Sequence, residues 1–320
     1  MSNNYFSIPN NKIVSILVKI FSNLYDLPRL IERENASHRD GTQWELESVG
    51  NHSLLRIHKP DLSDIRLNLS LLWNAASSPS VLNSAKKMLL FLLVKMNQQC
   101  QHKGTRLRDD ITFPLQELVD CGLYASIRSA RKGFLATEEV LSSIQIMGYD
   151  KVGGEKGKKE VVISEPICPF TDFSISHNLC SVTLNPAMDV AFFCHSYAVV
   201  PKEVFTLSNR GFTLLWYLCF LARQNWKELK EKGCFTVRTH TIQTLLSLPP
   251  EEGNKDVKRT IKQPVEDAIQ EIMEATKGTM EIEIVKQGTS IKEYLKQGTL
   301  LVKMKSSFIE YYQQLFENKN

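Results

Sequence analysis

Residues 256–275 read DVKRTIKQPVEDAIQEIMEA, a segment with an uneven distribution of charge. Apolar residues recur at helical spacing from Val257 to Ile272 and predict one buried face. The basic residues share a neighbouring face in the first half of the segment, and the acidic residues follow. The helix macrodipole favours the opposite order by ~0.3–1 kcal/mol per charge, so helix stability does not explain this arrangement. The basic residues on this face are Lys255, Lys258, Arg259 and Lys262.

A second predicted helix, from Ser126 to about Ser143, repeats this arrangement. Arg128, Arg131 and Lys132 lie on one side, and acidic residues follow in the second half. A recognition helix enters the major groove of DNA through its N-terminal residues, so this order suits a helix directed at DNA. The alternative for either helix alone is an ordinary solvated face. Because the arrangement occurs twice, we favour the DNA-binding interpretation.

Both helices occupy the same place in a repeated order of predicted elements. The order is helix, strand, short helix, longer helix and hairpin, which is typical of winged helix-turn-helix domains. The sequence therefore predicts an α+β, predominantly helical chain with tandem winged helix-turn-helix domains. The first copy is predicted from helix 84–96, strand 111–113, helices 114–120 and 126–143, and hairpin 144–163; the second from helix 208–224, strand 235–237, a short helix from 239 or 241, helix 256–275 and hairpin 280–304.

Pro264 lies inside the second of these long helices. A proline there removes an N–H, clashes with the carbonyl of Thr260 and costs ~3 kcal/mol. Either the helix is kinked at this point or its regular part starts at Pro264.

The tips of the two predicted wings carry further cations. The first tip is rich in glycine and flexible enough to follow a phosphate backbone, although an ordinary soluble loop is the alternative. It lacks the spacing of a phosphate-binding P-loop. The lysines are Lys151, Lys156, Lys158 and Lys159 in the first wing, and Lys286, Lys292 and Lys296 in the second.

The chain is long enough for two domains. It has 320 residues, of which 42% are hydrophobic and 23% charged, as in ordinary globular proteins. We expect an N-terminal extension over residues 1–80, a first winged-helix domain over 81–173 and a second over 174–320. The net charge of +4 alone does not argue for nucleic acid. The apolar stretch 13–24 predicts an amphipathic helix rather than a signal peptide or a membrane segment.

Enzyme chemistry finds little support in the sequence. The seven histidines are dispersed, and the seven cysteines never adopt C-x-x-C spacing. We therefore expect no enzymatic activity, no metal site and no cofactor. Scattered, odd-numbered cysteines fit a reducing cytoplasm.

The run 257–272, VKRTIKQPVEDAIQEI, resembles the recognition helix of plasmid replication initiators with two winged-helix domains. In that family a run of the form R-x-x-[IL]-x-x-P-[AV]-x-x-[AI]-x-x-[EI] precedes the C-terminal wing. The resemblance covers about residues 84–308, and the first eighty residues and the long second wing depart from the pattern. It implies a protein that binds repeated double-stranded sites in a replication origin and helps to open it. It also implies that the N-terminal winged domain can mediate homodimer formation and that host replication proteins are partners. The DNA-reading positions that it implies are Arg128, Arg131, Lys132, Lys258, Arg259 and Lys262.

Two other functions remain open from the sequence. A winged-helix transcriptional repressor would need the same recognition surface. A partitioning or structural adaptor would use these helices for protein contacts without DNA. Direct repeats in the neighbouring DNA favour the initiator, and a lone palindrome favours the repressor.

Overall fold

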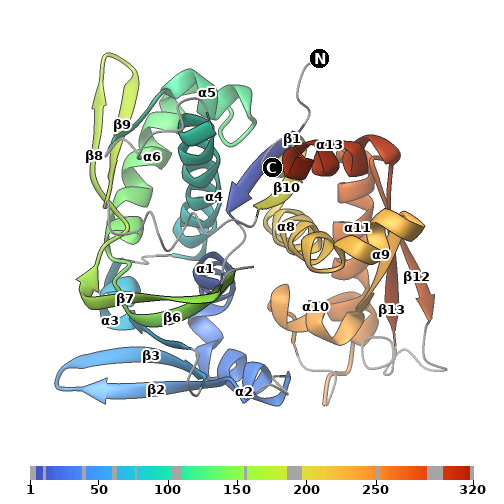
Figure 1. Ribbon diagram of the computed structural model, residues 1–320, viewed down its shortest axis with the longest axis horizontal. Helices are drawn as coiled ribbons and strands as arrows, with labels where there is room; N and C mark the ends of the chain where they lie inside the picture. The colour runs from blue at the N-terminus through green and yellow to red at the C-terminus, as the bar shows by residue number, and fades with distance from the viewer. Residues whose placement is uncertain are drawn as a thin grey trace. The chain divides into compact units, whose positions relative to one another are not determined.

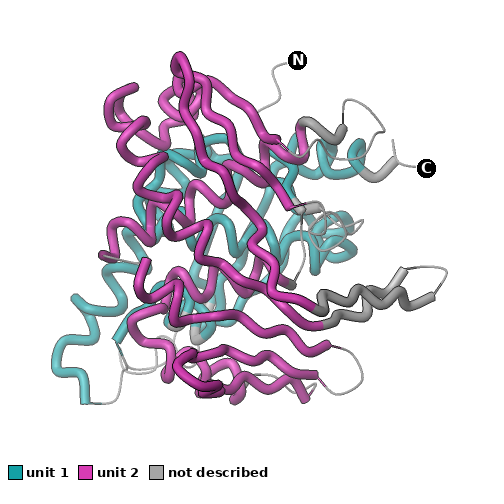
Figure 2. Tube along the Cα trace, turned by 90° about the vertical axis from the view of Figure 1, so that its left-hand side faces the viewer, with its two compact units in different colours: residues 1–8, 197–320 teal, residues 9–196 magenta. Residues whose placement is uncertain are grey.

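The computed structural model describes residues 5–9, 12–37, 41–59, 63–75, 78–101, 110–154, 157–185, 197–249, 253–286 and 298–317. The chain divides into two compact units (Figure 2). The N-terminal unit is Pro9–Ser196, and the C-terminal unit combines Tyr197–Asn320 with Met1–Ile8. The boundary expected near Phe173 falls inside a strand of the N-terminal unit.

The first part of the N-terminal unit is integrated into its core rather than appended to it. Helix α1 (Lys12–Asn23) buries its apolar residues, as its amphipathic pattern predicts, and packs on the long helix α4 (Pro79–Gln101). Helix α2 (Leu27–Ser37) packs on strand β2, and α3 (Leu69–Ala75) packs on β3. A single turn of 3-10 helix, Leu24–Asp26, joins α1 to α2.

A five-stranded antiparallel sheet follows the order β2-β3-β4-β6-β7 (Figure 1). One face is apolar and buried because Trp44, Ile57 and Ile65 alternate with polar residues along their strands. Its strands are β2 (Gln43–Val49), β3 (His52–Lys59), β4 (Ser63–Asn68), β6 (Ile146–Gly154) and β7 (Gly157–Ile167).

The hairpin β6–β7 is the segment expected to form the first wing, and the structure places it in this sheet instead. Strand β6 pairs with β4 in unbroken register from Ile146 to Asp150, whereas its pairing with β7 shifts register between Ile146 and Gly148. Gly148 has a φ of +127°, and a Cβ there would lie 1.7 Å from the carbonyl oxygen of Asp64. The absence of a side chain therefore lets the two backbones approach.

The first helix-turn-helix is built from α4, β5 (Asp110–Pro114), α5 (Leu115–Asp120) and α6 (Ile127–Ser142). Strands β8 (Phe170–Ser176) and β9 (Leu179–Leu184) complete it as a hairpin with the sheet order β5-β9-β8. The turn between them holds His177 and Asn178 at positive φ, a conformation that asparagine tolerates well. Helix α6 packs on β8, so the hairpin next to α6 is β8–β9.

The C-terminal unit repeats this topology without the inserted sheet. Its three-stranded sheet has the order β11-β13-β12, so that the strand after the first helix again pairs with the last strand. Its elements are β10 (Tyr197–Pro201), a 3-10 turn (Lys202–Thr206), α8 (Asn209–Gln224), α9 (Trp226–Lys232), β11 (Cys234–Arg238), α10 (Thr239–Leu245), the π-helical turn η3 (Lys258–Lys262), α11 (Gln263–Ala275), β12 (Met280–Lys286), β13 (Thr299–Met304) and α13 (Ser306–Glu317).

Strand β1 (Tyr5–Pro9) pairs with β10 in a two-stranded sheet. The ring of Tyr5 meets that of Phe308 edge to face, with centroids 5.4 Å apart. The backbone N–H of Val199 in β10 donates to the hydroxyl of Tyr312 at 3.1 Å. The beginning and the end of the chain are therefore packed in the same unit.

The fold class is α+β, and the expectation of a predominantly helical chain is wrong. The described residues form one sheet of five strands, two of three and one of two. The strands of residues 43–68 and the β8–β9 hairpin account for most of the difference. Within the described part of the chain, no helix combines the length and apolar character needed to cross a membrane.

Candidate nucleic-acid interface

Helix α6 carries the first set of predicted DNA-reading residues. Ser126 caps it, and the capping box with Ser129 satisfies N–H groups at its first turn. The helix buries Ala130 and Phe134 and leaves Arg128, Arg131 and Lys132 exposed. The structure therefore brings these three basic residues together on the solvent side of α6.

The turn that precedes α6 is packed closely against it. A Cβ at Gly133 would lie 2.2 Å from Cε1 of Tyr124, so glycine makes room for that ring. The turn thereby fixes the approach of α5 to α6.

The β8–β9 turn is attached to this helix pair at two points. Arg131 donates from Nη2 to Oδ1 of Asn178 at 2.7 Å. The backbone N–H of Leu115, at the start of α5, donates to the carbonyl of Asn178 at 2.8 Å. Residues 170–184 contain neither lysine nor arginine, so this turn positions Arg131 and adds no cation of its own.

The second predicted recognition helix begins with a π-helical turn and not with an α-helical one. The N–H of Gln263 donates to the carbonyl of Lys258, five residues back. Regular α-helix starts at Gln263, with Pro264 in its first turn. Pro264 has no N–H to donate, and it lies where the π-helical turn passes into regular α-helix rather than in the middle of an unbroken α-helix. Of the two alternatives left open by the sequence, the start near Pro264 is the one observed.

The basic residues of this segment differ in their surroundings. Lys255, Lys258 and Arg259 are exposed, and the N–H of Arg259 donates to the Asp256 carboxylate at 3.2 Å. Lys262 is partly buried, with its Nζ 3.7 Å from the Glu266 carboxylate. Three of the four predicted cations therefore face solvent at the front of the helix, and the fourth is paired along it.

One acidic residue in the rear of α11 has a structural role. Glu271 accepts hydrogen bonds from the backbone N–H and the hydroxyl of Ser208, both at 2.5 Å. Ser208 is the N-cap of α8, so this carboxylate joins the ends of two packed helices. At least one of the acidic residues that follow the basic ones is therefore explained by the packing of α11 on α8.

The lysines predicted for the two wings lie on strands or outside the described residues. Strand β6 contains Lys151, β7 contains Lys158 and Lys159, and Lys286 ends β12. The structure describes the backbone of these four residues but not their side chains. Lys156, Lys292 and Lys296 lie outside the described residues. Since β6 and β7 belong to the five-stranded sheet, the structure does not bring the first set next to α6 as a wing.

Asn178 is the functional candidate that the sequence reasoning missed. From its prolines, the segment from Pro166 to Pro201 is interpreted as a linker joined to one strand-like stretch, Ser181-Val182-Thr183-Leu184, and not as a hairpin. A two-residue turn containing asparagine between alternating runs was the available signal.

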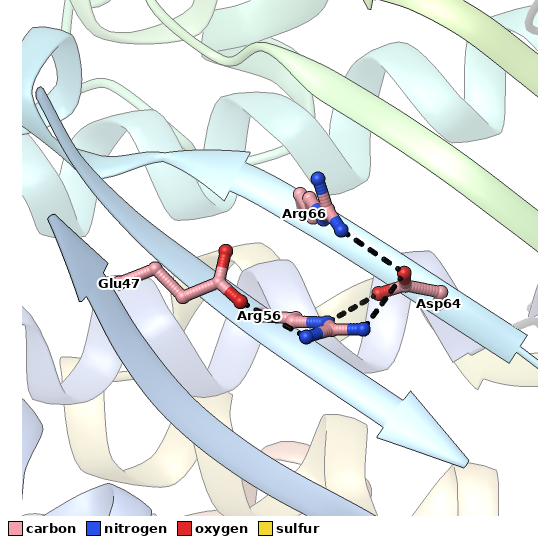
Figure 3. Close-up of polar contacts among 4 residues, drawn as sticks. All are labelled: Glu47, Arg56, Asp64 and Arg66. Atoms are coloured by element: carbon pink, nitrogen blue, oxygen red, sulfur yellow. Dashed lines mark hydrogen bonds and ion pairs between the residues drawn. The ribbon is translucent and has the colours of Figure 1, made fainter. Parts of the chain in front are cut away.

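The polar face of the five-stranded sheet holds a second group of charges (Figure 3). Arg56 contacts both oxygens of Asp64, at 2.9 and 3.3 Å, and also donates to Glu47 at 3.1 Å. Arg66 donates to the same Asp64 at 3.3 Å. The hydrogen bond with Asp64 is the main cause of the raised pKa of Arg56. Two cations and two carboxylates balance each other here, so this cluster offers no excess positive charge to a phosphate.

No group of histidine, cysteine, aspartate and glutamate side chains in the described part of the molecule is arranged to hold a metal ion. Burial raises the pKa of the Cys180 thiol to about 12, which keeps it protonated and unreactive.

Comparisons with known proteins give distant similarities only. No family model matches the chain, and no curated protein matches it. Among solved structures, the chain is similar to a crystal structure of RctB domains 2-3, with 11% identity, a TM-score of 0.42, and coverage of 86% of this chain and 95% of that one. It is also similar to a selenomethionine derivative of domains 2 and 3 of RctB, with 10% identity, a TM-score of 0.41, and coverage of 90% and 98%. Similarity at this level carries no argument about function.

Proposed function

We propose that this protein is a sequence-specific double-stranded DNA-binding replication initiator with a winged helix-turn-helix module in each unit. The observation that carries the proposal is the repeated topology with exposed basic residues at the same place in both copies. In each copy a long helix, a strand, a short helix and a basic helix precede a hairpin, and the order of the three strands in the sheet is the same. The copies differ by α9 after the long helix of the C-terminal unit and by β6–β7 before the hairpin of the N-terminal unit.

The charge pattern supports contact with duplex DNA. Arg128, Arg131 and Lys132 are exposed on α6, and Lys258 and Arg259 are exposed on η3. Arginine and lysine can contact guanine edges in the major groove and phosphates beside it. Two such modules in one chain raise each other's effective concentration on a shared duplex. Repeated sites in a replication origin would exploit this gain.

Further parts of the proposal come from the resemblance to plasmid replication initiators. They are the use of the N-terminal winged module for homodimer formation, host replication proteins as partners, and a cytoplasmic location. The proposal includes no enzymatic activity, since binding and opening of an origin needs none from this chain.

The test begins with the exposed cations of the C-terminal unit. Replacing Lys258 and Arg259 together by alanine should weaken binding to a selected duplex by at least ~10-fold, because each good base contact is worth ~1–3 kcal/mol. The matched control is replacement of Lys227 and Lys230 by alanine: both are exposed on α9 of the same unit, and their loss removes the same charge. Fluorescence anisotropy gives the affinities, and thermal unfolding verifies that the variants remain folded.

Three outcomes separate the candidate functions. A footprint longer than one helical turn on direct repeats supports the initiator. A footprint on a single palindrome would support a transcriptional repressor instead. Absence of duplex binding would leave a partitioning or structural adaptor. Equal losses in both double variants would mean that binding depends on charge alone, and would contradict base recognition by Lys258 and Arg259.

A further inference from the structure

Leu135 is an apolar residue on the face of α6 that points away from the core. Its exposed fraction is 47%, which is high for leucine in the middle of a 16-residue helix. The side chains that α6 buries, including Phe134, Thr137 and Leu141, lie on the opposite side. Packing of α6 on its own unit therefore does not account for a leucine at this position.

The neighbours of Leu135 toward the N-terminus of α6 are the predicted DNA-reading residues, and Glu138 and Glu139 lie three and four residues after it. Lys132 lies three residues before it and Arg131 four, which places both next to Leu135 on one face. Arg128 lies seven residues before it, two turns or ~10 Å along the same stripe. The stripe therefore consists of cations at the front of the helix, an apolar side chain directly behind them, and Glu139 one turn further on.

The corresponding face in the C-terminal unit is entirely polar. The exposed residues of α11 are Gln263, Asp267, Gln270 and Glu274. Polar residues are sufficient for a solvent-exposed helix face, as α11 shows. The exposed Leu135 therefore distinguishes α6 from α11. The hydrogen bond from Arg131 to Asn178 also holds this stretch of α6 to the β8–β9 turn.

We propose that Leu135 contacts the C5-methyl group of a thymine in the major groove and so contributes to the sequence specificity of the N-terminal unit. The inference rests on the proposed function. The thymine methyl is the apolar group that the major groove presents, and it is read by apolar side chains. A leucine behind two or three cations meets it when those cations lie against neighbouring bases and phosphates.

The experiment compares thymine with uracil, which lacks only the C5-methyl group. The full-length protein selects a duplex from a random library, and each thymine of the selected site is then replaced singly by deoxyuridine. Wild-type protein should lose about three- to tenfold in affinity at one or two of these positions, as expected for one desolvated methyl group. L135A should bind the thymine duplex as weakly as wild type binds the uracil duplex, with no further loss on uracil.

Leu46 supplies the matched control. It lies in β2 of the same unit and is 45% exposed, so L46A removes the same amount of apolar surface away from α6. L46A should retain wild-type affinity and wild-type sensitivity to uracil. Thermal unfolding of L135A should be unchanged, and L135Q, which keeps the length of the side chain, replaces it if L135A does not fold.

Several results would overturn the inference. They are equal affinity of wild type for all uracil duplexes, a selected site without thymine, or an L135A variant that still distinguishes thymine from uracil. Any of these results, obtained with a protein that binds duplex DNA, leaves the proposed function intact and makes Leu135 an exposed leucine without a DNA contact. Failure to select any duplex would refute the proposed function itself.

Discussion

Replacement of Lys86 by methionine is expected to stabilise the protein, and more so at neutral than at high pH. Lys86 lies in α4 with its side chain fully buried. Its Nζ donates to the hydroxyl of Ser22 in α1 at 3.1 Å. Burial, with a smaller contribution from Lys87, lowers the pKa of Lys86 from 10.5 to about 7.

The size of the effect follows from the difference in pKa between the folded and the unfolded chain. Above pH ~10.5 the amine of Lys86 is neutral in both states. As the pH falls from there to 7, the unfolded chain binds a proton that the folded chain excludes, so stability decreases. Below pH 7 both states are protonated and the loss is constant. A pKa lowered from 10.5 to about 7 corresponds to a loss of about 5 kcal/mol at 1.36 kcal/mol per pH unit.

Methionine removes this penalty and forfeits the hydrogen bond to Ser22, which is worth ~1 kcal/mol. We therefore expect Lys86→Met to raise the free energy of unfolding by about 2–4 kcal/mol at pH 7 and by much less at pH 10. Urea unfolding followed by tryptophan fluorescence at several pH values from 6 to 10 measures the difference. Lys87→Met, on the same helix but only partly buried, is the control and should change little. An identical pH dependence in wild type and Lys86→Met would refute the argument.

Three further substitutions test the packing of the fold. Gly148→Ala should destabilise the N-terminal unit by ~3 kcal/mol or more, since its Cβ would collide with the Asp64 carbonyl and its φ is +127°; an unchanged thermal midpoint would contradict the close approach of β6 to β4. Tyr312→Phe should cost ~1–3 kcal/mol in urea unfolding, because the buried N–H of Val199 loses its acceptor, and a neutral result would mean that this N–H has another partner. Pro264→Ala should change the free energy of unfolding by less than ~1 kcal/mol, since the proline lies in the first turn of α11; a gain near ~3 kcal/mol would instead indicate a proline strained in a helix interior.

The helices of the C-terminal unit were predictable because their signals are local. Ser208 begins α8 as its N-cap, and Pro264 marks the start of α11. The placement of the basic residues on an exposed face also follows from helical spacing alone. Exposure of Lys258 and Arg259 therefore agrees with the prediction from sequence.

The first hairpin shows why the rest could not be predicted. Residues 144–163 alternate like a wing, and only pairing with β4, about eighty residues earlier, assigns them to another sheet. That pairing depends on the bare backbone at Gly148. The β8–β9 hairpin, in turn, looks like a linker because prolines flank it. The hydrogen bond between Arg131 and Asn178 joins residues 47 positions apart, so no local sequence pattern predicts it.

Strand β1 has a consequence for the order in which this protein folds during synthesis. It leaves the ribosome before β10, its partner, which follows roughly 190 residues later, or about 10–40 s later at ordinary translation rates. The unit Pro9–Ser196 is complete before that partner exists. Closure of the C-terminal unit then requires the pairing of β1 with β10, a contact of very high sequence separation and hence slow to form. A fragment that starts at Tyr197 would lack this strand, and residues 1–9 added as a separate peptide would be needed to complete its sheet.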